Sequence, residues 1–188
     1  MRLFSRLQHY FYQRNVAKQV RPLKRPAVSR AAIESIGILF DVTDLDEAQQ
    51  VLSYKKQLER EGKRVRLLAY INSRSKEVEA NYPFFLRSDI NRWDSIPKGQ
   101  AVEDFMTTSF DLLMVITATS TLPFEYISLL TDARLKVGAN GRNADIYDLM
   151  LDIPEDKSLK YIIQTIEDYL KVVLPKKTMK KKSQLATT

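Results

Sequence analysis

The sequence predicts an α/β domain, a three-layer sandwich in which helices cover both faces of a mostly parallel sheet. Two observations lead to this fold class. Short apolar runs, of the length expected for buried strands, alternate along the chain with longer segments of helical periodicity. The clearest of these segments form a strand-helix-strand unit, whose strands are expected to be parallel and joined by a right-handed crossover. A chain of 188 residues is long enough for one such domain with flanking segments.

The strand-helix-strand unit spans residues 35–71. Its strands are Ser35–Asp41 (SIGILFD) and Arg64–Ile71 (RVRLLAYI), apolar runs suited to a buried, Rossmann-like sheet. In the helix between them, Asp44 and Glu47 fit a capping box, and Gly62 stands where a helix-ending glycine belongs. The apolar positions of this helix fall at helical spacing: Leu45, Ala48, Leu52 and Leu58.

The following segments continue the alternation as far as residue 174. A short strand fits residues 84–86, a helix 101–109, a strand 110–117, and a helix with Pro123 near its first turn 122–133. We expect strands at residues 134–138 and 146–153, the second half-exposed, and Trp93 is expected to anchor the loop after the short strand. The closing helix, from residue 158, should bury one stripe: Leu159, Ile162, Ile163, Ile166, Tyr169 and Leu170.

The charge of the chain is divided between its ends and its middle. Residues 1–30 hold eight Lys or Arg and residues 171–188 hold six, with no acid in either segment. Residues 31–170 hold the other 16 basic residues against all 23 acids, a net charge of −7. We therefore divide the chain into a basic N-terminal part (1–30), an acidic α/β domain (31–174) and a Lys-rich C-terminal tail (175–188) that is expected to be disordered.

The N-terminal part is expected to combine a short amphipathic helix with an extended linker. The apolar residues of the helix fall on one side of it: Leu3, Phe4, Leu7, Tyr10 and Phe11. Pro22 and Pro26 then favour an extended chain. The helix needs a surface to cover, and three candidates for that surface remain open. They are its own domain, a partner protein, and an anionic membrane surface, with Leu3, Phe4, Leu7 and Phe11 as the docking residues.

The basic ends predict a polyanionic partner such as RNA or a ribonucleoprotein assembly. The residues expected to contact it are Arg2, Arg6, Arg14, Lys18, Arg21, Lys24 and Arg25 in the N-terminal part, and Lys176, Lys177, Lys180, Lys181 and Lys182 in the tail. Because no aromatic residue lies among the tail lysines, the tail would contact phosphates without reading bases. Two alternatives are that both ends serve solubility only, and that they fold onto the acidic domain of the same chain.

Composition excludes several kinds of site. Cysteine is absent, so no disulfide, thiolate nucleophile or thiolate metal site can form, and the single histidine, His9, lies outside the α/β domain. No cofactor is expected. The longest uncharged run, residues 112–124, contains a proline and is too short and too polar to span a bilayer, so a cytoplasmic location is expected.

The stretch KVGANGR, residues 136–142, holds two glycines three apart and invites comparison with a phosphate-binding loop. It lacks the spacing and the Gly-Lys-Ser/Thr ending of a P-loop, and also the third glycine of a dinucleotide fingerprint. No convincing helix follows it to receive a phosphate. Gly138 and Gly141 are therefore interpreted as turn residues.

Candidate ligand-binding residues follow from the expected sheet, because ligands bind parallel sheets beyond the carboxyl ends of the strands. The positions selected in this way are Asp41, Asn72, Ser73, Arg74, Thr117, Thr119, Ser120 and Thr121. The candidate site consists of Asp41, Arg74, Thr117, Thr119 and Ser120. The alternative for Ser120 and Thr121 is that a hydroxyl caps the following helix. Three further acids, Asp145, Asp148 and Asp152, are interpreted as a solvated sheet edge rather than a metal site.

Residues 110–138 (FDLLMVITATSTLPFEYISLLTDARLKVG), with YDLMLDI and a closing helix ending in YLKVV, resemble an uncharacterised family of small α/β proteins from Bacteroidota. The similarity covers most of residues 1–172 and implies the fold but no activity. The strand-helix-ARLKVG order is also similar to the N-terminal half of heptosyltransferase-type glycosyltransferases. Their second, nucleotide-sugar-binding domain is not expected within these 188 residues.

Three functions remain open. The leading hypothesis is a non-enzymatic intracellular adaptor whose basic ends contact a polyanion. The first alternative is a domain that binds a small ligand or sugar phosphate. The second is a peripheral membrane protein held by its N-terminal helix.

Overall fold

Six parallel strands form a single sheet in the computed structural model, which describes residues 29–42, 45–73, 78–119, 121–139, 145–154 and 156–174. The strands are β1 (Ser35–Val42), β2 (Arg64–Ile71), β3 (Phe84–Leu86), β4 (Phe110–Ile116), β5 (Ala133–Ala139) and β6 (Leu149–Leu151). Their order across the sheet is β3-β2-β1-β4-β5-β6, and every neighbouring pair is parallel. This order is that of a Rossmann-like sheet and confirms the predicted fold class.

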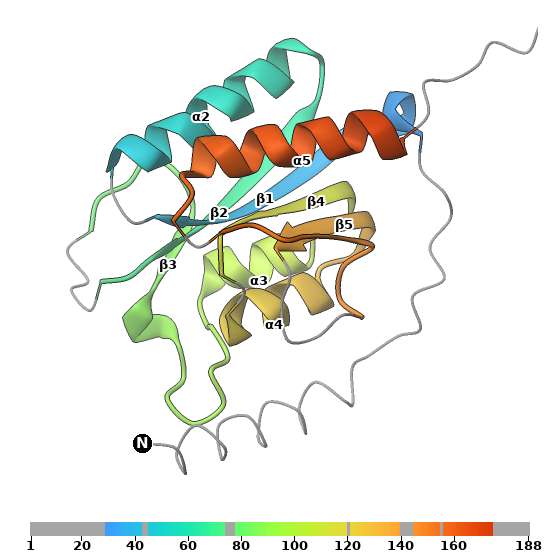
Figure 1. The fold of residues 1–188 in the computed structure, drawn as a ribbon. Helices are drawn as coiled ribbons and strands as arrows, with labels where there is room; N and C mark the ends of the chain where they lie inside the picture. Colours follow the sequence, from blue (N-terminus) through green and yellow to red (C-terminus); the bar gives the residue numbers. More distant parts are fainter. Residues whose placement is uncertain are drawn as a thin grey trace, which may run out of the picture.

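Helices cover both faces of the sheet. α2 (Leu45–Arg60) and α5 (Leu159–Val173) lie side by side on one face, and α3 (Gln100–Met106) and α4 (Leu122–Leu130) lie on the other (Figure 1). Two short 3-10 helices complete the described elements: η1 (Arg30–Ala32) before β1 and η2 (Arg87–Asp89) after β3. Each face therefore has its own apolar core, as a three-layer sandwich requires.

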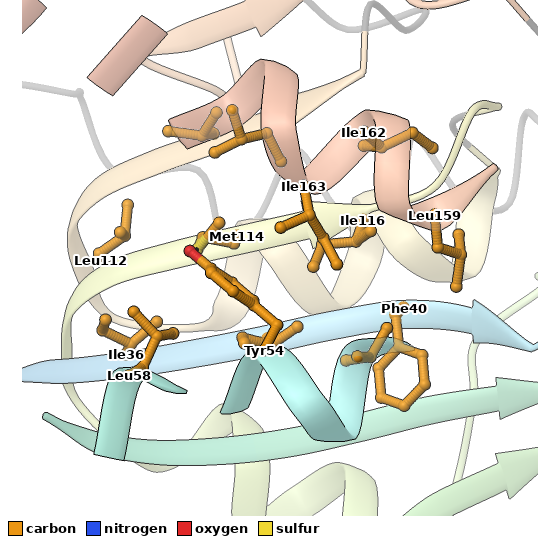
Figure 2. Close-up of a cluster of buried hydrophobic side chains, with 14 of the residues drawn as sticks. Ile36, Phe40, Tyr54, Leu58, Leu112, Met114, Ile116, Leu159, Ile162 and Ile163 are labelled. Atoms are coloured by element: carbon orange, nitrogen blue, oxygen red, sulfur yellow. The ribbon is translucent and has the colours of Figure 1, made fainter. Parts of the chain in front are cut away.

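The central strand β1 is buried on both faces because its side chains alternate between the two cores. Ile36, Ile38 and Phe40 pack on the α2/α5 side, and Leu39 packs on the α3/α4 side. Figure 2 shows the first of these cores, in which Tyr54 reaches from α2 toward Met114 of β4. The uninterrupted apolar sequence of β1 is thus explained by burial from two sides.

The predicted strand-helix-strand unit is confirmed as β1-α2-β2. Gly62 has a φ of 80°, in the left-handed region that only glycine adopts readily, and it ends the turn after α2. The backbone N–H of Lys63 donates to the Leu58 carbonyl at 3.0 Å, which closes this turn. Ala48 and Leu58 are buried under the helix, as predicted. The proposed cap residue Asp44 lies outside the described residues.

Three sequence-based predictions near the C-terminal half are corrected. Gly138 is a residue of β5 and not of a turn, and the Tyr147 ring packs against it. The last strand covers only Leu149–Leu151 of the predicted 146–153, because Ile146 and Tyr147 leave the strand and enter the α3/α4 core. On α5, Tyr169 is 50% exposed and does not belong to the buried stripe, which the other five predicted residues do form.

The acidic residues near β6 lie at the edge of the sheet, and Asp148 is exposed there, as expected. Asp148 has a structural role in addition, because its Oδ2 accepts a hydrogen bond from the Lys136 backbone N–H at 2.7 Å. The Asp148 backbone N–H in turn donates to the Lys136 carbonyl at 2.9 Å. This reciprocal pair ties the turn before β6 to β5. Asp145 and Asp152 are exposed.

Several predictions fall outside the described residues. They concern the N-terminal helix and its linker (1–28), the C-terminal tail (175–188) and Gly141.

Candidate functional site

A pocket of about 810 Å³ opens at the carboxyl edge of the sheet, on the side of α3 and α4. It lies where β2 and β3 end and where α4 begins. Its lining residues come from these three places and from the segment after η2: Tyr70, Asn72, Arg87, Ser88, Ile90, Asn91, Arg92, Ser95, Thr121, Pro123 and Phe124. We call this cavity the carboxyl-edge pocket. Its position agrees with the rule that open parallel sheets bind ligands beyond the carboxyl ends of their strands.

The charge of the carboxyl-edge pocket is opposite to that of the domain around it. Arg87 and Arg92 line it, and no acid does, although residues 31–170 carry a net charge of −7. Both arginines are exposed. Within the part of the chain that the structure describes, the Arg87 guanidinium has no carboxylate within 4.0 Å. A concave, locally positive surface of this kind favours an anionic ligand.

Two acids lie in the segment that carries the two arginines, but their carboxylates accept hydrogen bonds from backbone N–H groups. Asp89 Oδ2 accepts from the Leu86 N–H at 2.8 Å, and Asp94 Oδ1 accepts from the Ile96 N–H at 3.1 Å. These hydrogen bonds shape the segment that carries the two arginines. The acids therefore act on the pocket indirectly, by fixing the loop that forms its wall.

The segment after η2 is a closed loop. The Asn91 N–H donates to the Ile96 carbonyl at 2.9 Å, and Ile90 forms an antiparallel bridge with Pro97. Ser95 has a φ of 59°, which turns the chain back at the tip. The loop projects beyond α3 and α4, between η2 and α3 (Figure 1). Trp93 lies at this tip and is 66% exposed, so it does not anchor the loop by burial in the core.

The N-terminus of α4 forms a second wall. Thr121 occupies the N-cap position, but its side chain makes no capping hydrogen bond, so capping by the Thr121 hydroxyl is not seen. Pro123 stands in the first turn, as predicted, where a missing N–H costs nothing. The partial positive charge of the helix N-terminus adds to that of the arginines, although Glu125 in the same turn opposes it.

Aromatic rings pack beneath the pocket. The Tyr70 ring lies 5.2 Å from the Phe85 ring and 6.1 Å from the Phe124 ring, centroid to centroid. The Tyr70 hydroxyl donates to Asn72 Oδ1 at 3.4 Å. Burial raises the pKa of Tyr70, as does the negative charge of Asp41, while the positive charge of Arg87 lowers it. Tyr70 therefore lies within the fields of both charged groups.

Asp41 lies beside Tyr70 in the register of β1 and β2. Burial raises the pKa of the Asp41 carboxyl from its ordinary 3.8 to about 6. The charge of Glu47 adds to this effect, and a hydrogen bond with the Val42 backbone opposes it. Asp41 is thus an acid that titrates close to neutral pH at the carboxyl edge.

The remaining residues of the predicted site are only partly described. Thr117 is buried, and its hydroxyl donates to the Thr119 carbonyl at 3.1 Å and accepts from the Thr119 N–H at 3.3 Å. Thr119 itself is exposed. Asp41, Thr117 and Thr119 do not line the carboxyl-edge pocket, and Arg74 and Ser120 lie outside the described residues. Ligand binding by this set stays a prediction.

Sequence reasoning missed Arg87, Ser88 and Arg92, although a usable signal was present. These residues follow the short strand β3, so the carboxyl-end rule applies to them as well. The rule was applied only to the first, second and fourth strands. Asn72 and Thr121, which the rule did select, line the pocket.

Two classes of feature are absent from the part of the chain that the structure describes. No three or more His, Asp or Glu side chains converge in a group that could hold a metal ion. No helix among these residues has the length and apolarity that crossing a bilayer demands.

Comparison with known proteins gives a family but no activity. A search of curated proteins finds no match. The model of DUF6913, described as a family of unknown function, matches residues 8–173. This match covers the whole sheet and all the helices described above. The chain therefore belongs to the DUF6913 family.

Proposed function

We propose that this domain binds a small phosphate-bearing ligand in the carboxyl-edge pocket. The observation that carries the proposal is the lining itself, which holds Arg87 and Arg92 and no acid within an otherwise acidic domain. Guanidinium groups present several N–H donors in a planar fork that matches phosphate oxygens. The volume of about 810 Å³ falls in the range of small-molecule sites.

The polar groups of the lining are suited to binding rather than to proton transfer. Apart from the two arginines they are the amides of Asn72 and Asn91 and hydroxyl groups. Such groups hydrogen-bond a ligand without changing their protonation state near neutral pH. A sugar phosphate is one ligand of this class, in keeping with the resemblance to heptosyltransferase-type glycosyltransferases.

Isothermal titration of the full chain with pyrophosphate tests the proposal. The test variant is Arg87→Ala and the matched control is Arg60→Ala, which removes the same charge from the exposed last turn of α2. We expect Arg87→Ala to weaken binding about 10-fold or more, because a hydrogen bond to a charged group contributes about 1.5–3 kcal/mol. Arg60→Ala should bind as the wild type does. Equal losses in the two variants, or no binding by the wild type, would contradict the proposal.

A second candidate function rests on the charge distribution of the sequence. We propose that the basic ends contact a polyanion such as RNA, because residues 1–30 and 171–188 hold 14 basic residues and no acid. Affinity for a single-stranded RNA should then fall steeply as salt rises, since phosphate contacts release counterions. Lys180→Gln, Lys181→Gln and Lys182→Gln together should reduce the steepness. An affinity that is insensitive to salt would exclude this function.

A further inference from the structure

The outer side of β2 is only partly covered by another strand. β1 pairs with β2 along its whole length, whereas β3 pairs only with residues 69–71. Successive residues of a strand direct their backbone groups to opposite sides, and the Ala69 N–H donates outward, to the Pro83 carbonyl at 3.0 Å. Val65 and Leu67 therefore direct their N–H and carbonyl groups to the same outer side. Among the described residues, no group hydrogen-bonds to either of them from that side.

A groove of about 460 Å³ lies along this open edge. β2 contributes Val65, Arg66 and Leu67 to its lining, and the other lining residues come from α2, α3 and residues 81–83. We call this cavity the β2-edge groove. It shares no lining residue with the carboxyl-edge pocket. Because Leu67 is only 5% exposed, its outward backbone groups have little access to water, and a strand bound in the groove would supply the partners that they lack.

The segment of the chain before Ser29, which lies outside the described residues, joins the domain close to this edge. Lys63, directly before β2, donates from Nζ to the Ile33 carbonyl at 2.6 Å, so the chain enters β1 beside the beginning of β2. The outer side of β2 is about two strand spacings from β1, or about 10 Å, which about three extended residues span. The DUF6913 model matches from residue 8 onward, so most of this N-terminal segment is part of the family unit.

We infer that the linker of residues 21–27 binds in the β2-edge groove as an edge strand antiparallel to β2. The direction follows from the connection, because the linker must run back toward the amino end of β1. Leu23 and Arg25 direct their backbone N–H and carbonyl groups to Val65 and Leu67, as in other complexes in which an extended segment is added to an open sheet edge. The linker thereby covers an edge that would otherwise invite pairing with another chain.

The spacing of the two linker prolines agrees with this arrangement. Pro22 and Pro26 are four residues apart, so both lie at positions that alternate with Leu23 and Arg25. The backbone of such a position faces solvent at the edge of a sheet, where the N–H that proline lacks is not needed. A proline at position 23 or 25 would instead remove a hydrogen bond to β2.

Charge also favours the linker as the occupant of the groove. Residues directly opposite each other in an antiparallel pair share a face, and Val65 and Leu67 pack on the α2/α5 side. Lys24 therefore lies on the opposite, α3 side, where Asp104 lines the groove. Within the described ranges, no cation lies within 4.0 Å of the Asp104 carboxylate. Residues 1–30 hold eight Lys or Arg and no acid, whereas residues 31–170 carry a net charge of −7.

The test is amide hydrogen exchange of the full chain, followed residue by residue by NMR. Leu23→Pro removes an N–H that faces β2, and we expect the Val65 and Leu67 amides to exchange at least about 10-fold faster than in the wild type. Lys24→Pro is the matched control, because it adds the same ring at a position whose N–H faces solvent. Its Val65 and Leu67 amides should exchange within about 2-fold of the wild type, since the surface ion pair that it loses contributes little. The Ala69 amide, which is bonded to Pro83, should be unchanged in both variants.

A second measurement locates the linker directly. Because the chain contains no cysteine, Lys24→Cys carries a single nitroxide label. We expect this label to broaden the amide signals of Asp104 and Phe105, which line the groove on the α3 side. Broadening that misses both residues would contradict the inference.

The exchange data can also overturn the inference in three ways. Val65 and Leu67 amides that exchange as fast in the wild type as in Leu23→Pro would show that the groove is empty. Equal acceleration in Leu23→Pro and Lys24→Pro would exclude the alternation on which the pairing depends. Protection in the wild type that rises with protein concentration would assign the edge to a second copy of the chain instead of the linker.

Discussion

The ring of Tyr147 occupies the space that a side chain at Gly138 would need. A Cβ atom placed on Gly138 would lie 2.7 Å from Cε1 and 2.8 Å from Cζ of Tyr147. The Tyr147 hydroxyl lies 3.2 Å from Ser128 Oγ, within hydrogen-bonding distance, so the ring is held at both ends. Glycine in β5 thus allows the turn before β6 to pack its tyrosine directly on the strand.

Gly138→Ala is expected to destabilise the domain by about 1–3 kcal/mol, the usual cost of overpacking a close-packed core. Urea denaturation of the variant measures this loss. The same substitution in a Tyr147→Ala background should cost much less, because the ring that it meets is gone. If Gly138→Ala costs the same in both backgrounds, contact with the ring is not the cause.

A second relationship joins α2 to α5. The Tyr54 hydroxyl donates to Glu167 Oε1, and Arg30 Nη2 donates to Glu167 Oε2 at 2.9 Å. Burial raises the pKa of Tyr54, and the nearby Glu167 raises it further, so the phenol stays protonated and remains a donor at physiological pH. Glu167 thus accepts from two elements that are distant in sequence.

Tyr54→Phe should lower the free energy of unfolding by about 1–2 kcal/mol, because Glu167 loses one of its donors in a partly buried site. Chemical denaturation at pH 7 measures the change. The matched control is Tyr161→Phe, since Tyr161 is 46% exposed on α5, and we expect almost no effect there. Equal effects in the two variants would show that the hydroxyl of Tyr54 contributes no specific stability.

Much of the fold could be predicted because its signals are local. The strands and the helix of β1-α2-β2 are indicated by the spacing of their apolar residues and by a glycine at the end of the helix. The predictions made from these two signals are confirmed. The failures have a different cause. Gly138 resembles a turn residue by type, but its role is set by Tyr147, which contacts it from the next segment. A contact between side chains of different segments cannot be predicted from the local sequence pattern.

The candidate site was less predictable for the same physical reason. The carboxyl-end rule selected Asn72 and Thr121, which line the pocket, but it cannot say which neighbouring loops close over the edge. Arg87 and Arg92 enter the site through η2 and a loop fixed by Asp89 and Asp94, and these hydrogen bonds depend on backbone geometry. Burial of a large side chain is likewise not fixed by its type, as the exposed Trp93 and Tyr169 show.

Asp41 predicts a pH dependence of stability whose sign follows from its raised pKa. The unfolded chain ionises this carboxyl near 3.8, whereas the folded domain holds its proton up to about pH 6. Its contribution to stability is therefore greatest below pH 3.8 and is lost as the pH rises through 6.

Asp41→Asn removes this loss, so the variant should exceed the wild type in stability at pH 8, and the difference should shrink as the pH falls from 6 to 4. One pKa unit corresponds to about 1.4 kcal/mol, and partial exposure reduces the full difference, so we expect a gain of about 1–2 kcal/mol at pH 8. Urea denaturation of both proteins between pH 4 and pH 8 measures it. Glu47→Gln should move the wild-type transition to lower pH, because the charge of Glu47 contributes to the raised pKa. If Asp41→Asn raises the free energy of unfolding by the same amount at every pH, Asp41 is not the titrating group.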